Sequence, residues 1–119
     1  IFLYLCTEFV RGSMNITTNN EALVDLIQFG KTKDKKYRGL PKGVVSGFLK
    51  AYKILKREER VENLYKYKGL NYEKLSGEDI ESVRCNDKYR LMFHSSAKEN
   101  SIILTEIELL EITNHYGKI

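Results

Sequence analysis

The sequence predicts an α+β fold in which two N-terminal helices pack on one face of an antiparallel β-sheet. Three observations predict it. Apolar residues recur at helical spacing in the first half of the chain, the apolar period changes to two after about residue 70, and the helices precede the strands instead of alternating with them. Helices that come first in the chain are expected to cover one face of the sheet and leave the other open.

The first helix is predicted in "TNNEALVDLIQFG". Thr18 followed by Glu21 three residues later fits a capping box at a helix start. Leu23, Leu26 and Ile27 mark one apolar face, and Gly30 is suited to end the helix.

The second helix is predicted in "LPKGVVSGFLKAYKILKREE", where Pro41 suits the first turn. Gly47 weakens the helical pattern slightly. Apolar side chains at helical spacing form one face, and cations point largely away from it. The apolar face contains Val44, Val45, Phe48, Tyr52 and Leu55, and the opposite face contains Lys50, Lys53, Lys56 and Arg57.

Strands are predicted in "LNYEKL", "ESVRCNDKYRLMFHSS" and "SIILTEIELLEI", with polar turns at "SGED" and "KENS". A two-residue loop in the central hairpin would set apolar residues opposite polar ones. A three-residue loop, residues 86–88, pairs Cys85 with Tyr89 and Val83 with Leu91 and gives one consistent apolar face, so we prefer it.

That register sets Arg84 opposite Arg90 on the face away from the core. Two like charges directly opposed in a sheet are unfavourable by up to about 1 kcal/mol. Two explanations remain open. Glu106 and Glu108 on the next strand could compensate the arginines, or the pair could await an anion such as phosphate, which guanidinium groups bind bidentately.

Length and charge narrow the function classes. A chain of 119 residues fits one domain. Residues 31–60 hold eleven Lys and Arg against three Asp and Glu, whereas residues 69–119 hold six against nine. The basic half indicates a polyanion or an acidic partner, or a solvated lysine-rich helix face.

The sequence contains no apolar run long enough to span a membrane, and Cys6 and Cys85 make no disulfide framework. We therefore expect a cytoplasmic protein.

Residues 1–13 are expected to be a non-native or tag-derived segment. "RGSM" resembles a vector or protease-site remnant, and Met14 resembles a natural first residue. Residues 14–119 would then form the single domain.

The later residues resemble the RelE/ParE toxin superfamily, specifically its HigB-like branch. The similarity lies in "LNYEKLSG", "ESVRCNDKYRLMF" and the C-terminal "EITNHY", and covers residues 71–116. It implies two helices on a curved antiparallel sheet whose concave open face binds RNA. It also implies a ribosome-dependent mRNA endonuclease, an mRNA interferase that inhibits translation. The implied partners are the ribosome, mRNA and an antitoxin. The antitoxin would be a small helix-turn-helix protein, and this protein would bind operator DNA only through it.

The resemblance also implies the site residues. Arg84 and Arg90 match the family's sheet arginines and would clamp the scissile phosphate. His115 and Tyr116 fall on the C-terminal triplet in swapped order, and Asn114 replaces its Asp. Lys74 or Lys68 would substitute for a turn lysine that is absent at position 76. Further RNA contacts are expected from Lys68, Asn86, Asn114, Lys50, Lys53, Lys56 and Arg57.

The implied reaction is metal-independent attack of a ribose 2′-OH on the adjacent phosphate. It needs a base for the 2′-OH, positive charge on the phosphate and an acid for the leaving 5′-oxygen. His115 can serve as base or acid near neutral pH, with Tyr116 aiding it. No residue cluster has metal-ligand spacing and no cofactor is expected. We expect His94, on the same sheet face, to be a neighbour and not a catalyst.

Two other functions stay open. ParE-like members of the superfamily inhibit DNA gyrase and are not nucleases. The missing turn lysine and Asn114 would also fit a catalytically weakened homologue that acts through antitoxin and DNA binding. A generic RNA-binding domain is disfavoured, because the sequence lacks an exposed aromatic pair in an RNA-recognition pattern.

Overall fold

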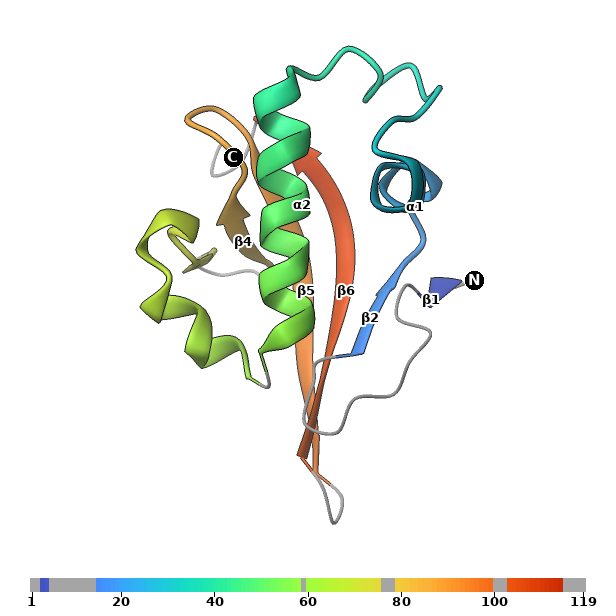
Figure 1. Cartoon of the computed structure of the whole chain (residues 1–119). Helices are drawn as coiled ribbons and strands as arrows, with labels where there is room; N and C mark the ends of the chain where they lie inside the picture. The colour runs from blue at the N-terminus through green and yellow to red at the C-terminus, as the bar shows by residue number, and fades with distance from the viewer. Residues whose placement is uncertain (1–2, 5–14, 59, 76–78, 100–102, 115–119) are drawn as a thin grey trace.

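The computed structural model describes residues 3–4, 15–58, 60–75, 79–99 and 103–114. These residues form an α+β fold, with a six-stranded sheet in the order β1-β2-β6-β5-β4-β3 and the long helix α2 lying across it (Figure 1). The elements are β1 (Leu3–Tyr4), β2 (Asn15–Thr18), α1 (Glu21–Phe29), α2 (Lys42–Arg57), the 3₁₀ helices η1 (Val61–Lys66) and η2 (Lys68–Leu70), β3 (Glu73–Lys74), β4 (Glu81–Arg84), β5 (Arg90–Glu99) and β6 (Ile103–Thr113).

The sheet is mixed, so the expectation of a purely antiparallel sheet is wrong in one pairing. β2 runs parallel to β6, with Ile16 opposite Ile107 and Thr18 opposite Leu109. The other pairings are antiparallel. The strand β2 was not predicted, because "NITT" is short and largely polar and its partner lies about 90 residues away in the sequence.

The helix α1 begins two residues later than the capping box predicts. Its N-cap is Asn20, whose side-chain oxygen accepts a hydrogen bond from Ala22 N at 3.1 Å. Thr18 instead belongs to β2, and its hydroxyl donates to Leu109 O at 2.7 Å. The predicted end is confirmed: Gly30 has φ 74° and donates to Leu26 O at 2.9 Å, a conformation that favours glycine.

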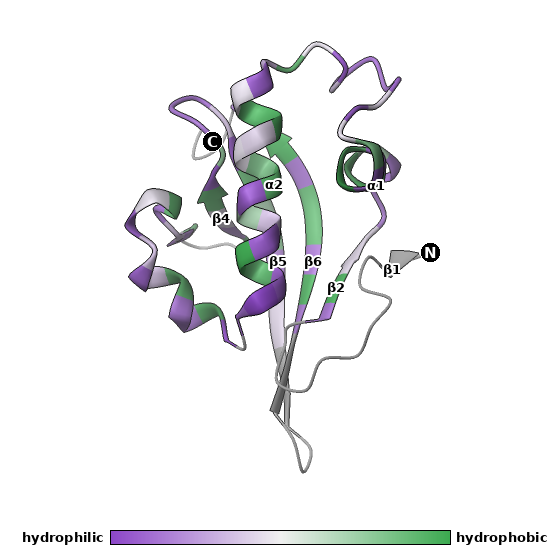
Figure 2. Ribbon diagram, viewed as in Figure 1, coloured by the Kyte–Doolittle hydropathy of each residue, from purple (hydrophilic) through white to green (hydrophobic). Residues whose placement is uncertain are grey.

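The helix α2 packs its apolar face on the sheet as predicted. Val44, Phe48 and Leu55 are fully buried in the core cluster, and hydrophobic residues alternate with hydrophilic ones along α2 and β6 (Figure 2). Gly47 is at a close approach to the sheet, since a Cβ there would lie 1.9 Å from Cys85 O. The 3₁₀ helices that follow α2 were not predicted; they bring Leu64 and Leu70 into the same core.

The central hairpin has the predicted three-residue loop and register. Val83 lies opposite Leu91 and Arg84 opposite Arg90, and Cys85 N donates to Tyr89 O at 2.9 Å. The alternation of apolar and polar residues was therefore sufficient to fix the pairing of β4 with β5.

A buried carboxylate ties the start of β4 to the segment after η2. Glu81 is 5% exposed. It accepts a hydrogen bond from the hydroxyl of Tyr72 and a second from Ser95 Oγ at 2.5 Å. Burial and the neighbouring carboxylate raise the pKa of the Tyr72 hydroxyl, which remains a donor at neutral pH. Tyr72 also stacks on Phe93, so it joins the polar pair to the core.

Replacing Tyr72 with phenylalanine is expected to lower the free energy of unfolding by about 1–3 kcal/mol, because Glu81 loses a buried donor while the ring is kept. Urea denaturation measures the change. Tyr65→Phe is the matched control: Tyr65 forms a T-shaped ring contact with Tyr72 but is 62% exposed, so a change within about 0.5 kcal/mol is expected. Equal effects of both variants would contradict the assignment.

Candidate functional site

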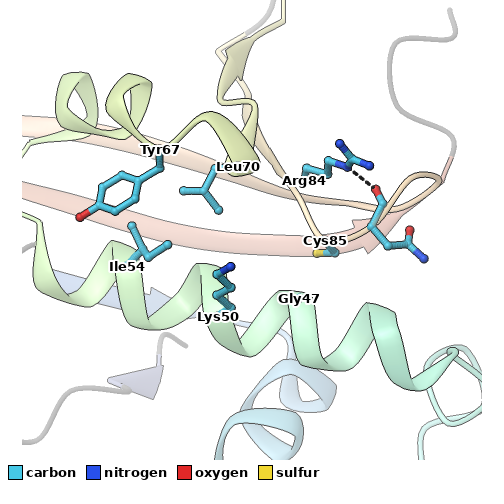
Figure 3. A pocket seen from close by; sticks show the side chains of 9 residues that line it. Gly47, Lys50, Ile54, Tyr67, Leu70, Arg84 and Cys85 are labelled. Carbon is cyan, nitrogen blue, oxygen red and sulfur yellow. Dashed lines mark hydrogen bonds between the residues drawn. The ribbon is translucent and has the colours of Figure 1, made fainter.

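A cavity of about 320 Å³ lies between α2, the β4–β5 hairpin and residues 61–70, which contain η1 and η2 and are called the 3₁₀ segment. Residues from these three segments line it (Figure 3): Gly47, Lys50, Ile54, Tyr67, Gly69, Leu70, Arg84, Cys85 and Asn86. The cavity thus brings a cation from α2 next to a cation from β4, which are 34 positions apart in the chain.

The inner wall of the cavity is apolar or backbone. Ile54, Leu70 and Cys85 are buried, and Gly47 and Gly69 contribute no side chain. Burial raises the pKa of the Cys85 thiol to about 12. The thiol is therefore protonated at neutral pH and is a poor nucleophile, so Cys85 shapes the wall and does not supply reactive sulfur.

The polar side of the cavity is cationic. Lys50 is exposed on α2, and among the described residues it has no ion-pair partner. Arg84 donates from Nε to Asn86 O at 3.2 Å and pairs through Nη2 with Asp87. The side chain of Asp87 is 84% exposed. An ion pair this exposed contributes little free energy, so an incoming anion can replace Asp87 on the guanidinium.

Asn86 has a structural role in the hairpin loop. Its side-chain oxygen accepts hydrogen bonds from Lys88 N at 2.9 Å and from Tyr89 N at 2.8 Å. These bonds fix the three-residue loop, in the way that asparagine side chains commonly stabilise turns. They also orient Asn86 O, which holds Arg84 at the cavity.

A second network attaches the 3₁₀ segment to the end of α2. The hydroxyl of Tyr67 donates to Glu58 and accepts from Arg57 Nη2 at 3.3 Å. Lys66 Nζ lies 3.2 Å from Glu58 Oε2. Glu58 is buried, and these contacts hold Tyr67 at the cavity's end. Arg57 was expected to bind RNA. Tyr67 was not predicted as a site residue, because its partner Glu58 lies outside any recognisable motif.

Glu58 is expected to make stability depend on pH. The hydrogen bond from Tyr67, and then contacts with Lys66, hold the pKa of its carboxyl below the ordinary value of 4.5. A carboxyl whose pKa is lowered by folding contributes stability above its unfolded pKa and loses it as the pH falls through the folded pKa. The stability advantage of the wild type over Glu58→Gln should hold above about pH 5 and shrink steadily below pH 4. Denaturation series at several pH values measure it, and an advantage that grows as the pH falls would contradict it.

Arg90 is paired with Arg84 in the register, but their side chains have different surroundings. Arg90 is 3% exposed, although it lies on the face away from the helices. It donates to Ser82 Oγ at 2.9 Å, to Ser82 O at 3.3 Å and to Asn71 O. Asn71 has φ 46°, a left-handed conformation that asparagine tolerates. The expectation that this face is open is therefore wrong around Arg90, Ser82 and Met92, which are all buried.

Neither acidic residue proposed to compensate the arginines lies beside them. Glu108 is opposite His94 and Glu106 is opposite Ser96, whereas Arg90 is opposite Thr113. The charges are instead accommodated by Asp87 on Arg84 and by oxygens of Ser82 and Asn71 on Arg90. His94, half-buried, is hydrogen-bonded through Nδ1 to Asp79 O, away from the cavity.

The predicted lysines are distributed unevenly around the cavity. Lys74 is exposed on β3 and is opposite Glu81, while Glu73 is opposite Ser82. The register therefore gives Lys74 the other sheet face from Arg84 and Arg90. Lys68 is exposed in η2 beside Gly69, which lines the cavity. Lys53 and Lys56 are exposed on α2 but do not line the cavity.

The predicted acid–base pair, His115 and Tyr116, lies outside the described residues. Asn114 is exposed and directly follows Thr113, which is opposite Arg90. The described chain therefore leaves the sheet at the end where Arg84 and Arg90 pair.

No protein-family model, curated protein or solved structure matches this chain. Within the described ranges, no helix is long and apolar enough to span a bilayer. The same ranges contain no group of three or more His, Cys, Asp or Glu that could hold a metal ion.

Proposed function

We propose that this protein is the toxin of a type II toxin–antitoxin pair and cleaves messenger RNA on the ribosome. The cavity that Lys50 and Arg84 share is the observation that carries the proposal. Two cations at one concave site, one of them ion-paired only with an exposed carboxylate, suit a phosphodiester that enters from solvent. Lys53 and Lys56 extend positive charge along the same helix, as contacts with a nucleic-acid backbone require.

The order of the elements supports a RelE-like fold for the described domain. Two helices precede a β-meander, and the segments quoted for the resemblance contribute β3, β4, β5 and the end of β6. The proposed partners follow from the same resemblance: the ribosome and mRNA as the target, and an antitoxin that silences the protein.

The proposed chemistry divides between the cavity and the C-terminal tail. The guanidinium of Arg84 and the ammonium of Lys50 hold the phosphate and stabilise the negative charge that builds on it. The ribose 2′-oxygen forms a bond to phosphorus as the bond to the 5′-oxygen breaks, giving a 2′,3′-cyclic phosphate and a 5′-hydroxyl. His115 and Tyr116 would accept the 2′ proton and deliver one to the 5′-oxygen. Arg90 supports the hairpin that presents Arg84.

One observation favours a catalytically weakened homologue as the second candidate. Arg90 is bound to Ser82 and Asn71, and Lys74 is on the other face, so Lys50 and Arg84 are the only predicted cationic site residues that line the described cavity. A protein of this kind would keep its binding partners and cleave slowly or not at all.

Mapping RNA ends after induction in growing cells tests the proposal. We expect growth arrest and new 5′ ends only within translated frames, and loss of both in His115→Ala. Lys35→Ala is the control, because Lys35 is exposed in a loop outside the cavity. Growth arrest without new RNA ends, together with inhibited supercoiling by purified gyrase, would instead support the ParE-like alternative. If induction causes neither growth arrest nor new RNA ends, the result supports the catalytically weakened homologue.

A further inference from the structure

A second cavity, of about 440 Å³, lies on the other flank of α2, between this helix, α1 and the loop that joins them. We call it the α1–α2 groove. It is lined by Leu26, Gly30, Lys31, Thr32, Tyr37, Arg38, Leu40, Lys42, Val45, Ser46 and Leu49. It shares no residue with the Lys50–Arg84 cavity.

The floor of the α1–α2 groove is apolar and preformed. Leu26 and Tyr37 are buried, and Leu40, Val45 and Leu49 are half-buried. The Tyr37 hydroxyl accepts hydrogen bonds from Asn20 Nδ2 at 3.2 Å and from Ile112 N at 3.3 Å, so the ring is fixed in place. The floor therefore offers aliphatic and aromatic surface, and its polar group, the Tyr37 hydroxyl, is already hydrogen-bonded within the protein.

The rim of the α1–α2 groove is cationic. Lys31, Arg38 and Lys42 are exposed there, and none of the described lining residues carries a carboxylate. The nearby Asp25 accepts a hydrogen bond from Thr32 Oγ1 at 2.9 Å, which fixes the start of the loop. The Asp34 carboxylate accepts a hydrogen bond from Lys36 N at 2.8 Å, within the loop. These two carboxylates therefore help to fix the conformation of the loop, and three cations line the rim of the groove.

An exposed aromatic residue adjoins this groove. Phe29 is 67% exposed and directly precedes Gly30, which lines the cavity. Large side chains this exposed at the border of an apolar cavity with a polar rim are typical of protein interaction sites.

We propose that the α1–α2 groove binds an acidic amphipathic helix of a protein partner. Apolar side chains on one face of that helix would pack on Leu40, Val45 and Leu49, the arrangement of helix-in-groove recognition. Its carboxylates would pair with Lys31, Arg38 and Lys42, which would set its orientation and favour acidic over basic partners. RNA fits this groove less well, because the floor is mostly aliphatic. The inference does not depend on the proposed nuclease activity.

Peptide titration of the full chain tests this inference. The probe is a fluorescent 16-residue amphipathic peptide with leucines on one face and glutamates on the other, and its partner probe has lysines in place of the glutamates. At about 150 mM salt, where surface charges act over about 8 Å, only the acidic peptide is expected to bind. Arg38→Glu/Lys42→Glu should weaken binding at least about tenfold.

Matched variants separate groove binding from general attraction to basic surface. Lys33→Glu/Lys35→Glu makes the same charge change nearby, in the loop between α1 and α2, but neither residue lines the groove, so less than about a threefold loss is expected. Leu49→Ser should also weaken binding, because it removes apolar surface from the floor.

Three outcomes would overturn the proposal: no binding of the acidic peptide, equal binding of the lysine peptide, or equal losses of affinity in both charge-reversed double variants. An RNA oligonucleotide tests the alternative ligand: if it displaces the peptide from the wild type and binds Arg38→Glu/Lys42→Glu more weakly, the groove is assigned to nucleic acid. None of these binding measurements depends on RNA cleavage, so the groove proposal and the nuclease proposal can each fail without the other.

Discussion

Replacing Arg90 with alanine is expected to lower the free energy of unfolding by about 3 kcal/mol. The side chain is 3% exposed and donates to Ser82 Oγ and to the carbonyl oxygens of Ser82 and Asn71. Hydrogen bonds from a charged donor contribute about 1.5–3 kcal/mol, and truncation also removes the packing of the buried stem. The variant leaves these buried oxygens short of a donor.

Arg84→Ala is the matched control, because the two arginines are direct cross-strand partners with different surroundings. The Arg84 side chain is 43% exposed and pairs with an exposed Asp87. Its loss should change stability by less than about 1 kcal/mol. Arg90→Lys should be intermediate, since a lysine keeps the charge but not the planar donor geometry. Guanidinium denaturation of the three variants measures this, and a cost of Arg90→Ala no larger than that of Arg84→Ala would refute the structural role.

The second large effect is expected at Gly47. An added Cβ would lie 1.9 Å from Cys85 O and 2.7 Å from Cys85 C, which are backbone atoms that cannot turn aside. Alanine favours a helix by up to about 1 kcal/mol over glycine, whereas overpacking costs about 1–3 kcal/mol and sometimes more. Because the clash is with backbone, we expect Gly47→Ala to destabilise the protein by about 2 kcal/mol net. It should also widen the gap between α2 and the hairpin that presents Arg84.

Gly43→Ala controls for helix propensity on the same helix. Nothing lies within 4 Å of a Cβ at Gly43. Its stability should be unchanged or rise by up to about 1 kcal/mol. Thermal denaturation of both variants decides the matter. A gain in stability in Gly47→Ala would show that α2 does not approach Cys85 as closely as the structure indicates.

Local sequence patterns predicted the parts of the fold that local physics determines. The hairpin register followed from alternation, because a one-residue slip would have exposed Val83 and Leu91. Gly30 ended α1 through a conformation that favours glycine. The start of α1 was placed two residues too early, because Thr18 and Asn20 are both good caps and only the pairing of β2 with β6 decides between them.

The site was harder to predict because its geometry depends on distant segments. Arginine on the polar side of a strand is expected to face solvent, yet Arg90 is buried by contacts with Asn71, which lies 19 residues away. Gly47 appeared only as a weak point in a helix, since no local pattern reveals a sheet carbonyl beside it. Lys50 and Arg84 were each predicted separately, but their shared cavity depends on the 3₁₀ segment, whose irregular period gave no signal.

Cleavage of one defined message in a translating extract, with 5′ ends mapped over time, tests the central claim most directly. If Lys50 and Arg84 hold the reacting phosphate, Arg84→Ala should slow cleavage by at least about 100-fold and Lys50→Ala by about 10-fold. Both variants should keep near-wild-type stability, and Lys35→Ala should cleave within twofold of the wild type. Wild-type cleavage rates in both Arg84→Ala and Lys50→Ala would contradict the assignment of this cavity as the phosphate site.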